Sequence, residues 1–173
     1  MRRRALLVLA FWLPVIAGCG YHTVGSATHL PPGLKTLAVP LFTTQTNANH
    51  TEIALTDAVL HEFAARTRFH VVPADGPDAD AVVHGTILKQ YSAPLTYNTT
   101  TQQSSSFLIT LVVSVTIKDR DGRVLYENKN YTYREQYQAT SDLPTFIQED
   151  PAAMERLSRH FASQLVSDVL ESF

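Results

Sequence analysis

The sequence predicts an α+β fold: a two-layer sandwich with two helices packed on one face of a mixed, mostly antiparallel sheet of about four to five strands. The clearest pattern is in residues 107–117, which alternate apolar and polar side chains over eleven residues, a periodicity that a helix rarely mimics. Two further segments carry apolar stripes at helical spacing. The order along the chain is strand, helix, several strands, helix, and covering one sheet face is the simplest way to bury both stripes.

A short buried strand is predicted over Leu34–Phe42, an apolar run in which Pro40 marks the edge or the end, because proline cannot donate to a ladder. The polar stretch Thr43–His50 is typical of a turn. A helix capped by Asn49 is expected next, with Glu52 in its first turn. Its apolar residues recur four apart, and they are Leu55, Val59 and Phe63.

Strands are predicted again over Phe69–Val72 and from Ala81 onwards. Between them, Asp75, Asp78 and Asp80 lie among glycine and proline, a composition typical of a solvated turn. In the strand after Ala81, Val83, Ile87 and Tyr91 are expected on one face and His84, Thr86, Leu88 and Gln90 on the other. The uncharged polar segment Ser92–Ser105 is expected to form a loop.

Asp121-Gly122 predicts a hairpin turn after the strand Phe107–Ile117, since this pair favours the positive φ angles of a primed turn. The returning strand Val124–Tyr137 places four apolar or aromatic residues on one face, and they are Leu125, Tyr131, Tyr133 and Tyr137. The last helix is predicted to start at Asp150 as cap and Pro151 as first helical residue. Its stripe consists of Met154, Leu157, Phe161, Leu165 and Val169. The opposite face of the sheet is rich in threonine and serine, which suits water or a hydrophilic partner.

The first residues have the layout of an export signal, with three arginines followed by an apolar run that is too short to span a bilayer. The small residues Ala17-Gly18 precede Cys19, the single cysteine of the chain. This pattern predicts a bacterial lipoprotein cleaved between Gly18 and Cys19, with acyl chains on Cys19. The predicted organisation is a cleaved signal peptide over residues 1–18, a lipidated N-terminus and tether over 19–33, and a single α/β domain over 34–173.

Composition narrows the class of partner. Three of the 14 basic residues lie in the signal, so residues 19–173 carry 11 basic against 16 acidic residues, a formal charge of −5. A nucleic-acid partner is not expected, because such binding needs basic surface to displace counterions. With one cysteine there is no internal disulfide, so the fold depends on its core.

No catalytic motif is present: the sequence has no G-x-S-x-G, no H-E-x-x-H and no P-loop. The seven histidines have no metal-ligand spacing, and neither a metal site nor a cofactor is expected beyond the covalent lipid on Cys19. Lys118, Arg120 and Arg123 flank the predicted hairpin turn and are candidates for contact with an anionic glycolipid. The alternative for these cations is edge and turn charge that prevents sheet-to-sheet association.

Several segments resemble the LptE family, the lipopolysaccharide-assembly lipoproteins of the outer-membrane translocon. The resemblance covers nearly all of the chain after the signal. It lies in the start Cys19-Gly20-Tyr21-His22, the strand Leu34–Pro40 and the segment Asp78–Ile87, followed by the long strand, the Asp-Gly hairpin and the C-terminal helix. Family members commonly carry basic residues in the loop after the middle strand and before the last helix. In this sequence Ser92–Ser105 has none and Ala139–Asp150 is neutral to acidic.

The resemblance implies a non-enzymatic lipoprotein, anchored to the outer membrane at its periplasmic face, that binds and plugs the lipopolysaccharide-assembly β-barrel LptD. It would support assembly of the barrel and delivery of lipopolysaccharide to the outer leaflet, and lipopolysaccharide itself is an expected partner. The alternative is a periplasm-facing lipoprotein module that activates a cell-wall synthase or serves polysaccharide secretion.

Overall fold

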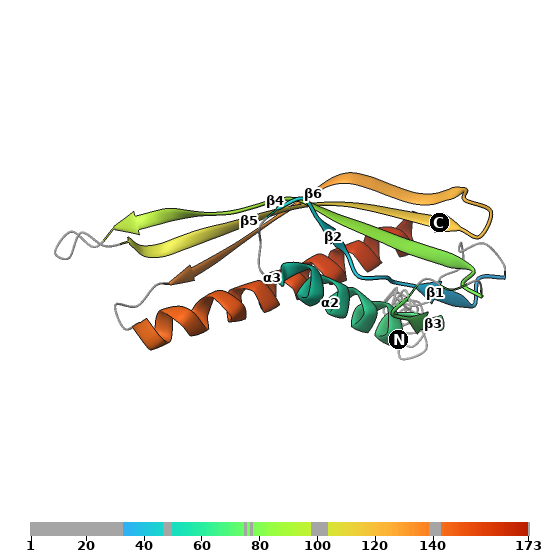
Figure 1. The fold of residues 1–173 in the computed structure, drawn as a ribbon, viewed down its shortest axis with the longest axis horizontal. Helices are drawn as coiled ribbons and strands as arrows, with labels where there is room; N and C mark the ends of the chain where they lie inside the picture. The colour runs from blue at the N-terminus through green and yellow to red at the C-terminus, as the bar shows by residue number, and fades with distance from the viewer. Residues whose placement is uncertain are drawn as a thin grey trace, which may run out of the picture.

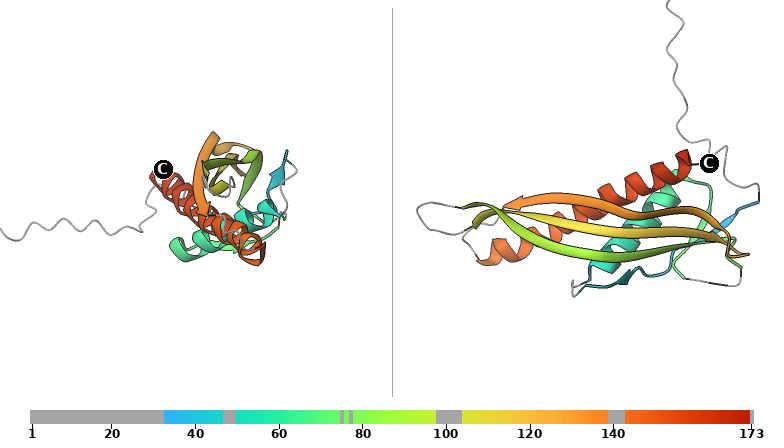
Figure 2. Two further views of the ribbon diagram at one scale, coloured as in Figure 1. Left: turned by 90° about the vertical axis from the view of Figure 1, so that its left-hand side faces the viewer. Right: turned by 90° about the horizontal axis from the view of Figure 1, so that it is seen from above.

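The computed structural model describes residues 33–46, 50–74, 76, 78–97, 104–138 and 143–172. It confirms the predicted α+β class: two helices, α2 and α3, cover one face of a mixed six-stranded sheet whose main order is β3-β1-β4-β5-β6 (Figure 1). Both further views show the helices together on the same side of the sheet (Figure 2). The opposite sheet face carries no helix in the described part of the chain.

The N-terminal half is a parallel β-α-β unit. β1 (Thr36–Ala38) pairs in parallel with both β3 (His70–Val72) and β4, and α2 (Thr51–Arg66) crosses from β1 to β3. β1 is shorter than the predicted strand Leu34–Phe42: it ends two residues before Pro40, the residue expected to mark its edge or end. The predicted turn over Thr43–His50 is wrong at its start, because the two-residue strand β2 (Thr43–Thr44) pairs in parallel with β4.

The N-cap position of α2 is His50, in a left-handed conformation and without a side-chain cap. Asn49, the predicted cap, lies outside the described residues.

The C-terminal half of the sheet is an antiparallel meander of three long strands, β4 (Ala81–Tyr97), β5 (Ser104–Asp119) and β6 (Val124–Gln138). The predicted loop over Ser92–Ser105 is therefore too long, because β4 continues to Tyr97 and β5 begins at Ser104. Uncharged polar residues such as threonine and serine are compatible with paired strands as well as with a loop. The far ends of β4 and β5 extend past the N-terminal end of α2, and in the described part of the chain α3 is the only helix beneath this extension (Figure 1).

A β-bulge corrects the predicted faces of β4. Up to Ile87 the alternation holds, with Val83 and Ile87 fully buried. Ile87 pairs with Val113 and Lys89 with Val112, so one extra residue at Leu88 shifts the register. A shift of one residue exchanges the two faces. Tyr91 is consequently 53% exposed instead of facing the core.

The last helix, α3 (Leu143–Glu171), begins eight residues before Pro151, the predicted first helical residue. Pro151 lies inside it and Pro144 is its second residue. A proline is well tolerated in a first turn, where its missing N–H has no acceptor, so Pro144 is compatible with the earlier start. Asp150-Pro151 has the composition of a helix start, but the chain is already helical when it reaches them.

The core lies between the helices and the inner sheet face. The predicted stripe of α2 is fully buried, as are Leu157, Phe161, Leu165 and Val169 of α3, while Met154 is half-buried. The inner residues of β5 are buried as predicted, from Ile109 to Ile117. On β6, Tyr131 and Tyr137 are buried and Leu125 and Tyr133 pack against the core.

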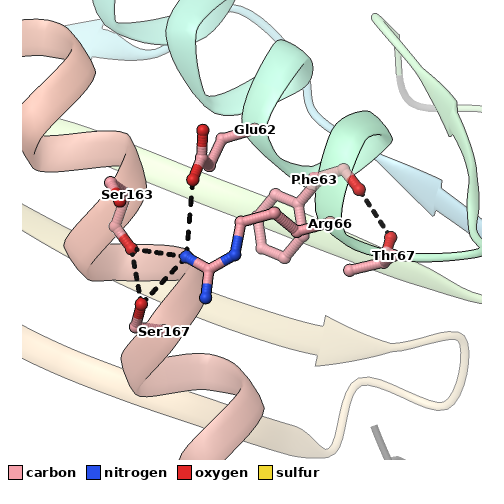
Figure 3. A network of polar contacts seen from close by, with 6 residues as sticks. All are labelled: Glu62, Phe63, Arg66, Thr67, Ser163 and Ser167. Atoms are coloured by element: carbon pink, nitrogen blue, oxygen red, sulfur yellow. Dashed lines mark hydrogen bonds and ion pairs between the residues drawn. The ribbon is translucent and has the colours of Figure 1, made fainter. Parts of the chain in front are cut away.

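Arg66 ties the two helices together (Figure 3). Its guanidinium Nη1 donates to the Ser163 carbonyl at 3.1 Å and to Ser167 Oγ at 2.9 Å, and it pairs with Glu62 on its own helix at 3.4 Å. The next residue, Thr67, ends the helix by donating both its N–H and its hydroxyl to the Phe63 carbonyl. Arg66 therefore links α2 to α3, and it also lies in the last turn of its own helix, where a positive charge is favourable.

Candidate functional site

The hairpin tip between β5 and β6 carries the three cations that the sequence singles out. Gly122 adopts a positive φ of 81° and donates its N–H to the Asp119 carbonyl at 3.0 Å, so the hairpin lies where the sequence predicts it. The predicted primed turn is wrong, because the central residues are Arg120 and Asp121 and neither has a positive φ; Gly122 takes the positive φ directly after them. Asp119 Oδ1 accepts the N–H groups of Asp121 and Arg123 at 3.1 and 2.8 Å. The Asp119 side chain thus holds the turn closed.

Two of the three cations have carboxylate partners. Arg123 Nε donates to Asp119 Oδ2 at 3.0 Å, and Arg120 Nη2 lies 3.3 Å from Asp80 Oδ1. The Arg120 Nε also approaches the Ala79 carbonyl, at 3.4 Å. Lys118 is exposed and has no ion pair within the described residues. The structure therefore brings the three together at one tip, but only Lys118 is left without a carboxylate partner there.

Asp80 joins this tip to the start of the parallel unit. Its Oδ2 accepts the backbone N–H groups of both Lys35 and Thr36 at 2.9 Å, while its own backbone contacts Thr36 and Arg120. The N–H groups of Thr36 and Lys35, followed by the charge of Arg120, hold the pKa of Asp80 below its ordinary value of 3.8. Asp80 thus has a structural role that the solvated-turn interpretation does not include.

A cleft of about 280 Å³ lies at the tip, lined by Gly33, Leu34 and Leu125 together with charged side chains. The charged residues are Asp80, Asp119, Asp121, Arg120 and Arg123, three carboxylates against two guanidinium groups. With Lys118 included, the tip has no net formal charge. Its field is mixed rather than positive, so an anion would be attracted only by local contacts.

A second polar cluster, which the sequence analysis missed, connects β6 to α3. Tyr131 donates its hydroxyl proton to Asp168 Oδ2 at 2.7 Å, Tyr126 in turn donates to the Tyr131 hydroxyl, and Gln164 donates to Asp168 Oδ1 at 2.6 Å. Burial, with the bonds to Tyr126 and Asp168, raises the pKa of Tyr131, and burial raises the pKa of Tyr133. Both phenols stay neutral, so the cluster fastens the helix to the sheet rather than supplying a nucleophile.

The outer sheet face is a third candidate surface. Tyr91, Thr110 and Arg134 are opposite one another on three adjacent strands, so they share the face turned away from the helices. Tyr91 and Arg134 are exposed, and Thr110 is only 3% exposed between them. Threonines also meet on this face nearer β2, where the hydroxyls of Thr43 and Thr86 are 3.0 Å apart. The face has the mostly polar, hydroxyl-rich character that the sequence predicts.

Among the described residues, no group of three or more histidine, cysteine, aspartate and glutamate side chains is placed to hold a metal ion. In the same part of the chain, no helix combines the length and the apolar character that crossing a membrane requires. Gly18 and Cys19 lie outside the described residues, so cleavage and lipidation there stay predictions.

The comparison with protein-family models identifies one family. A family model described as lipopolysaccharide-assembly, LptE, matches residues 34–169. No curated protein sequence matches the chain.

Solved structures share the fold at low sequence identity. A candidate lipoprotein from Caulobacter crescentus CB15 has a TM-score of 0.58 at 12% identity, over 76% of this chain and 88% of its own. Protein XCC0632 from Xanthomonas campestris has a TM-score of 0.55 at 14% identity, over 82% and 90%. A minor lipoprotein from Acinetobacter baumannii has a TM-score of 0.50 at 18% identity, over 82% and 94%.

Proposed function

The chain belongs to the LptE family of lipopolysaccharide-assembly proteins, a family of non-enzymatic outer-membrane lipoproteins, and on this premise we propose that it binds and plugs an LptD-like β-barrel. In this role it supports assembly of the barrel and delivery of lipopolysaccharide to the outer leaflet. The observation that carries the proposal is the family match over residues 34–169, which spans nearly all of the described body.

The outer sheet face supports this role physically. The lumen of a large outer-membrane barrel is polar, so a plug needs a surface that is hydrophilic without a strong charge of one sign. The row Tyr91, Thr110 and Arg134 combines an aromatic ring, a hydroxyl and one cation. Aromatic residues and arginine are the types most enriched in protein interfaces. We therefore propose that this face meets the barrel wall.

The anchor is the second part of the proposal. Cys19 carries acyl chains that hold the protein at the periplasmic face of the outer membrane, and residues 20–32 connect it to the body. Several chains on one residue anchor more firmly than one, because each buried CH₂ contributes about 0.8 kcal/mol. Labelling cells with an alkyne fatty acid tests this: the wild-type protein takes up label, and Cys19→Ser does not. Equal labelling of both would exclude Cys19 as the anchor.

Contact with the anionic glycolipid at the hairpin tip is the third part. Lys118 is the cation best placed for it, because Arg120 and Arg123 would have to exchange a carboxylate for a phosphate. Lys118→Glu should lower photocrosslinking between the purified protein and lipopolysaccharide, while Lys129→Glu, on β6 and paired with Glu127, serves as control. If both variants crosslink as the parent does, the tip makes no such contact.

Co-purification from outer membranes in mild detergent tests the main proposal. We expect a large outer-membrane β-barrel to accompany the tagged protein in stoichiometric amount. If the tagged protein is pure and folded but brings no barrel, the plug role is excluded. Depletion gives a second readout: loss of surface lipopolysaccharide is expected, whereas a cell-wall defect with normal surface lipopolysaccharide would favour the synthase-activating alternative.

A photocrosslinker at Tyr91 tests the proposed orientation. The residue is exposed on the outer sheet face, so crosslinks to barrel strands are expected. Arg120, at the end of the sheet, serves as a comparison position. Crosslinks to the barrel from Arg120 and none from Tyr91 would leave the plug role intact but refute the orientation.

A further inference from the structure

A groove lies between α2 and α3, and the proposed barrel contact makes no use of it. Its volume is about 420 Å³, and its floor consists of small side chains, Ala54, Ala58 and Ala65 from α2 with Ala162 from α3. Such a floor admits the backbone of another segment at short distance, because no long side chain stands in the way. Figure 1 shows the two helices side by side beneath the sheet.

Ser158 is a further small residue that lines the groove. Its side chain lines the groove and is 1% exposed, yet its hydroxyl has no hydrogen-bond partner within the described residues. Buried hydroxyl groups in proteins nearly always have a partner, since an unpaired one is destabilising. The Ser158 oxygen itself has almost no accessible surface, so Ser158 contributes to the groove as a small residue rather than as a hydrogen-bonding group.

The rim of the groove limits the chemistry of the occupant. Its charged residues include Glu62, which pairs with Arg66, and Glu155, which pairs with Arg159 at 3.6 Å. Asp57 on the same rim has no ion pair within the described residues. An occupant without carboxylates, and with groups able to donate hydrogen bonds, therefore fits best.

Residues 20–32 of the chain meet these requirements. This segment, GYHTVGSATHLPP, contains no aspartate, glutamate, lysine or arginine, and it includes the small run Gly25–Thr28 and two histidines. It joins the body at Gly33, next to Leu34, which lines an apolar cavity together with Phe63 and Val169 near the C-terminal ends of the two helices. Leu34 therefore lies near the C-terminal ends of α2 and α3, one residue from the point where the described body begins.

The length of the segment is also sufficient. Thirteen residues reach at most about 45 Å when extended. The groove from Ala54 to Ala65 follows eleven residues of α2, or about 16 Å at 1.5 Å per residue. The segment can turn round the helix ends and still span the groove.

We propose that residues 20–32 dock in the α2–α3 groove, with the small run Gly25–Thr28 against its alanine side chains. His22 and His29 lie towards the acidic rim at Asp57 and Glu62. Docking holds Cys19 beside the helical layer and leaves the outer sheet face open to a partner. The segment then binds to its own domain in addition to connecting that domain to Cys19.

A photocrosslinking amino acid at His61 tests this in the full-length lipoprotein, in its native membrane. His61 lines the groove and is exposed, so the substitution leaves the core intact. We expect intramolecular crosslinks to peptides from residues 20–32. The same group at Thr132, exposed on β6, should give none. Crosslinks from His61 only to another polypeptide, or no crosslinks in a correctly folded protein, would overturn the proposal.

A matched pair of variants supplies a second measurement. Ala65 and Ala64 are both exposed on α2, but only Ala65 lines the groove. Ala65→Tyr should reduce the His61 crosslink several-fold and speed proteolysis within residues 20–32, while Ala64→Tyr should match the parent in both. Circular dichroism verifies that each variant is folded. Equal behaviour of the two variants would show that the segment does not occupy the groove.

Discussion

Replacing Gly85 by alanine tests how closely the sheet and the β1–β2 connection fit together. A Cβ atom built on Gly85 would lie 2.2 and 2.3 Å from two ring carbons of Phe42, far inside van der Waals contact. The Phe42 ring is 2% exposed and contacts Phe161 edge to face, with centroids 6.2 Å apart. The ring therefore has little room to retreat, and the added methyl group has to displace it.

Two known effects set the range for the loss of stability caused by Gly85→Ala. Overpacking a core by a methyl group costs about 1–3 kcal/mol, and losing a buried phenylalanine altogether costs about 3–5 kcal/mol. We expect Gly85→Ala to lower the free energy of unfolding by about 2–4 kcal/mol, measured by urea unfolding with circular dichroism. The melting temperature should fall by about 2–4 °C per kcal/mol for a chain of this size.

A double-mutant cycle with Phe42→Ala isolates the cause. If the ring is what the new methyl group meets, Gly85→Ala should cost little once Phe42 is alanine, with a coupling of about 1 kcal/mol or more. Gly76→Ala is the matched control, because a Cβ there meets nothing within 4 Å, and its effect should stay within about 0.5 kcal/mol. Additive costs for Gly85→Ala and Phe42→Ala would refute the reasoning.

Three further predictions concern polar contacts. Tyr131→Phe removes the bond to Asp168 and should lower the free energy of unfolding by about 1.5–3 kcal/mol in urea titrations; an unchanged midpoint would mean that the bond contributes nothing. Asp80 has a lowered pKa, so its stabilisation is complete above 3.8 and is lost as pH falls through the lower folded value. Asp80→Asn should therefore be less stable than the parent at pH 7 but approach it in acid, and a gap that does not narrow below pH 3.8 would contradict this. Arg66→Gln should raise amide hydrogen exchange in the last turn of α2 while the sheet keeps its protection, since Arg66 bonds to Ser163 and Ser167 of α3. Equal exchange in both proteins would show that the contact does not hold the helix end.

Much of the architecture could be predicted from local pattern. The eleven-residue alternation of β5, the stripes of α2 and α3 and the position of the hairpin between β5 and β6 each depend on neighbours in the sequence, and each is confirmed. Periodicity fails where the backbone departs from regular geometry. The bulge at Leu88 turns Tyr91 outwards. No residue type in that segment indicates that a bulge is present.

The sequence predicted which cations lie at the hairpin tip, but it did not predict which carboxylates pair with them. Lys118, Arg120 and Arg123 do gather at one tip, because a tight hairpin brings them together. The partner of Arg120, however, is Asp80, forty residues away. The antiparallel pairing of β4 with β5, which sets Ala81 opposite Asp119, brings that carboxylate to the end of the hairpin. The near-neutral charge of the tip could therefore not be deduced from the spacing of the cations.

The sequence alone determined the fold class, the predicted export signal with its cysteine and the family, because periodicity, signal layout and motif order are properties of the linear chain. The tertiary structure decided what long-range pairing controls. It placed Asp80 between two backbone N–H groups and Arg120, and Phe42 over Gly85. It also set α2 beside α3, leaving an alanine-floored groove with the buried hydroxyl of Ser158. These contacts join residues far apart in sequence, and the local sequence pattern does not show which distant residue will pack against a given position.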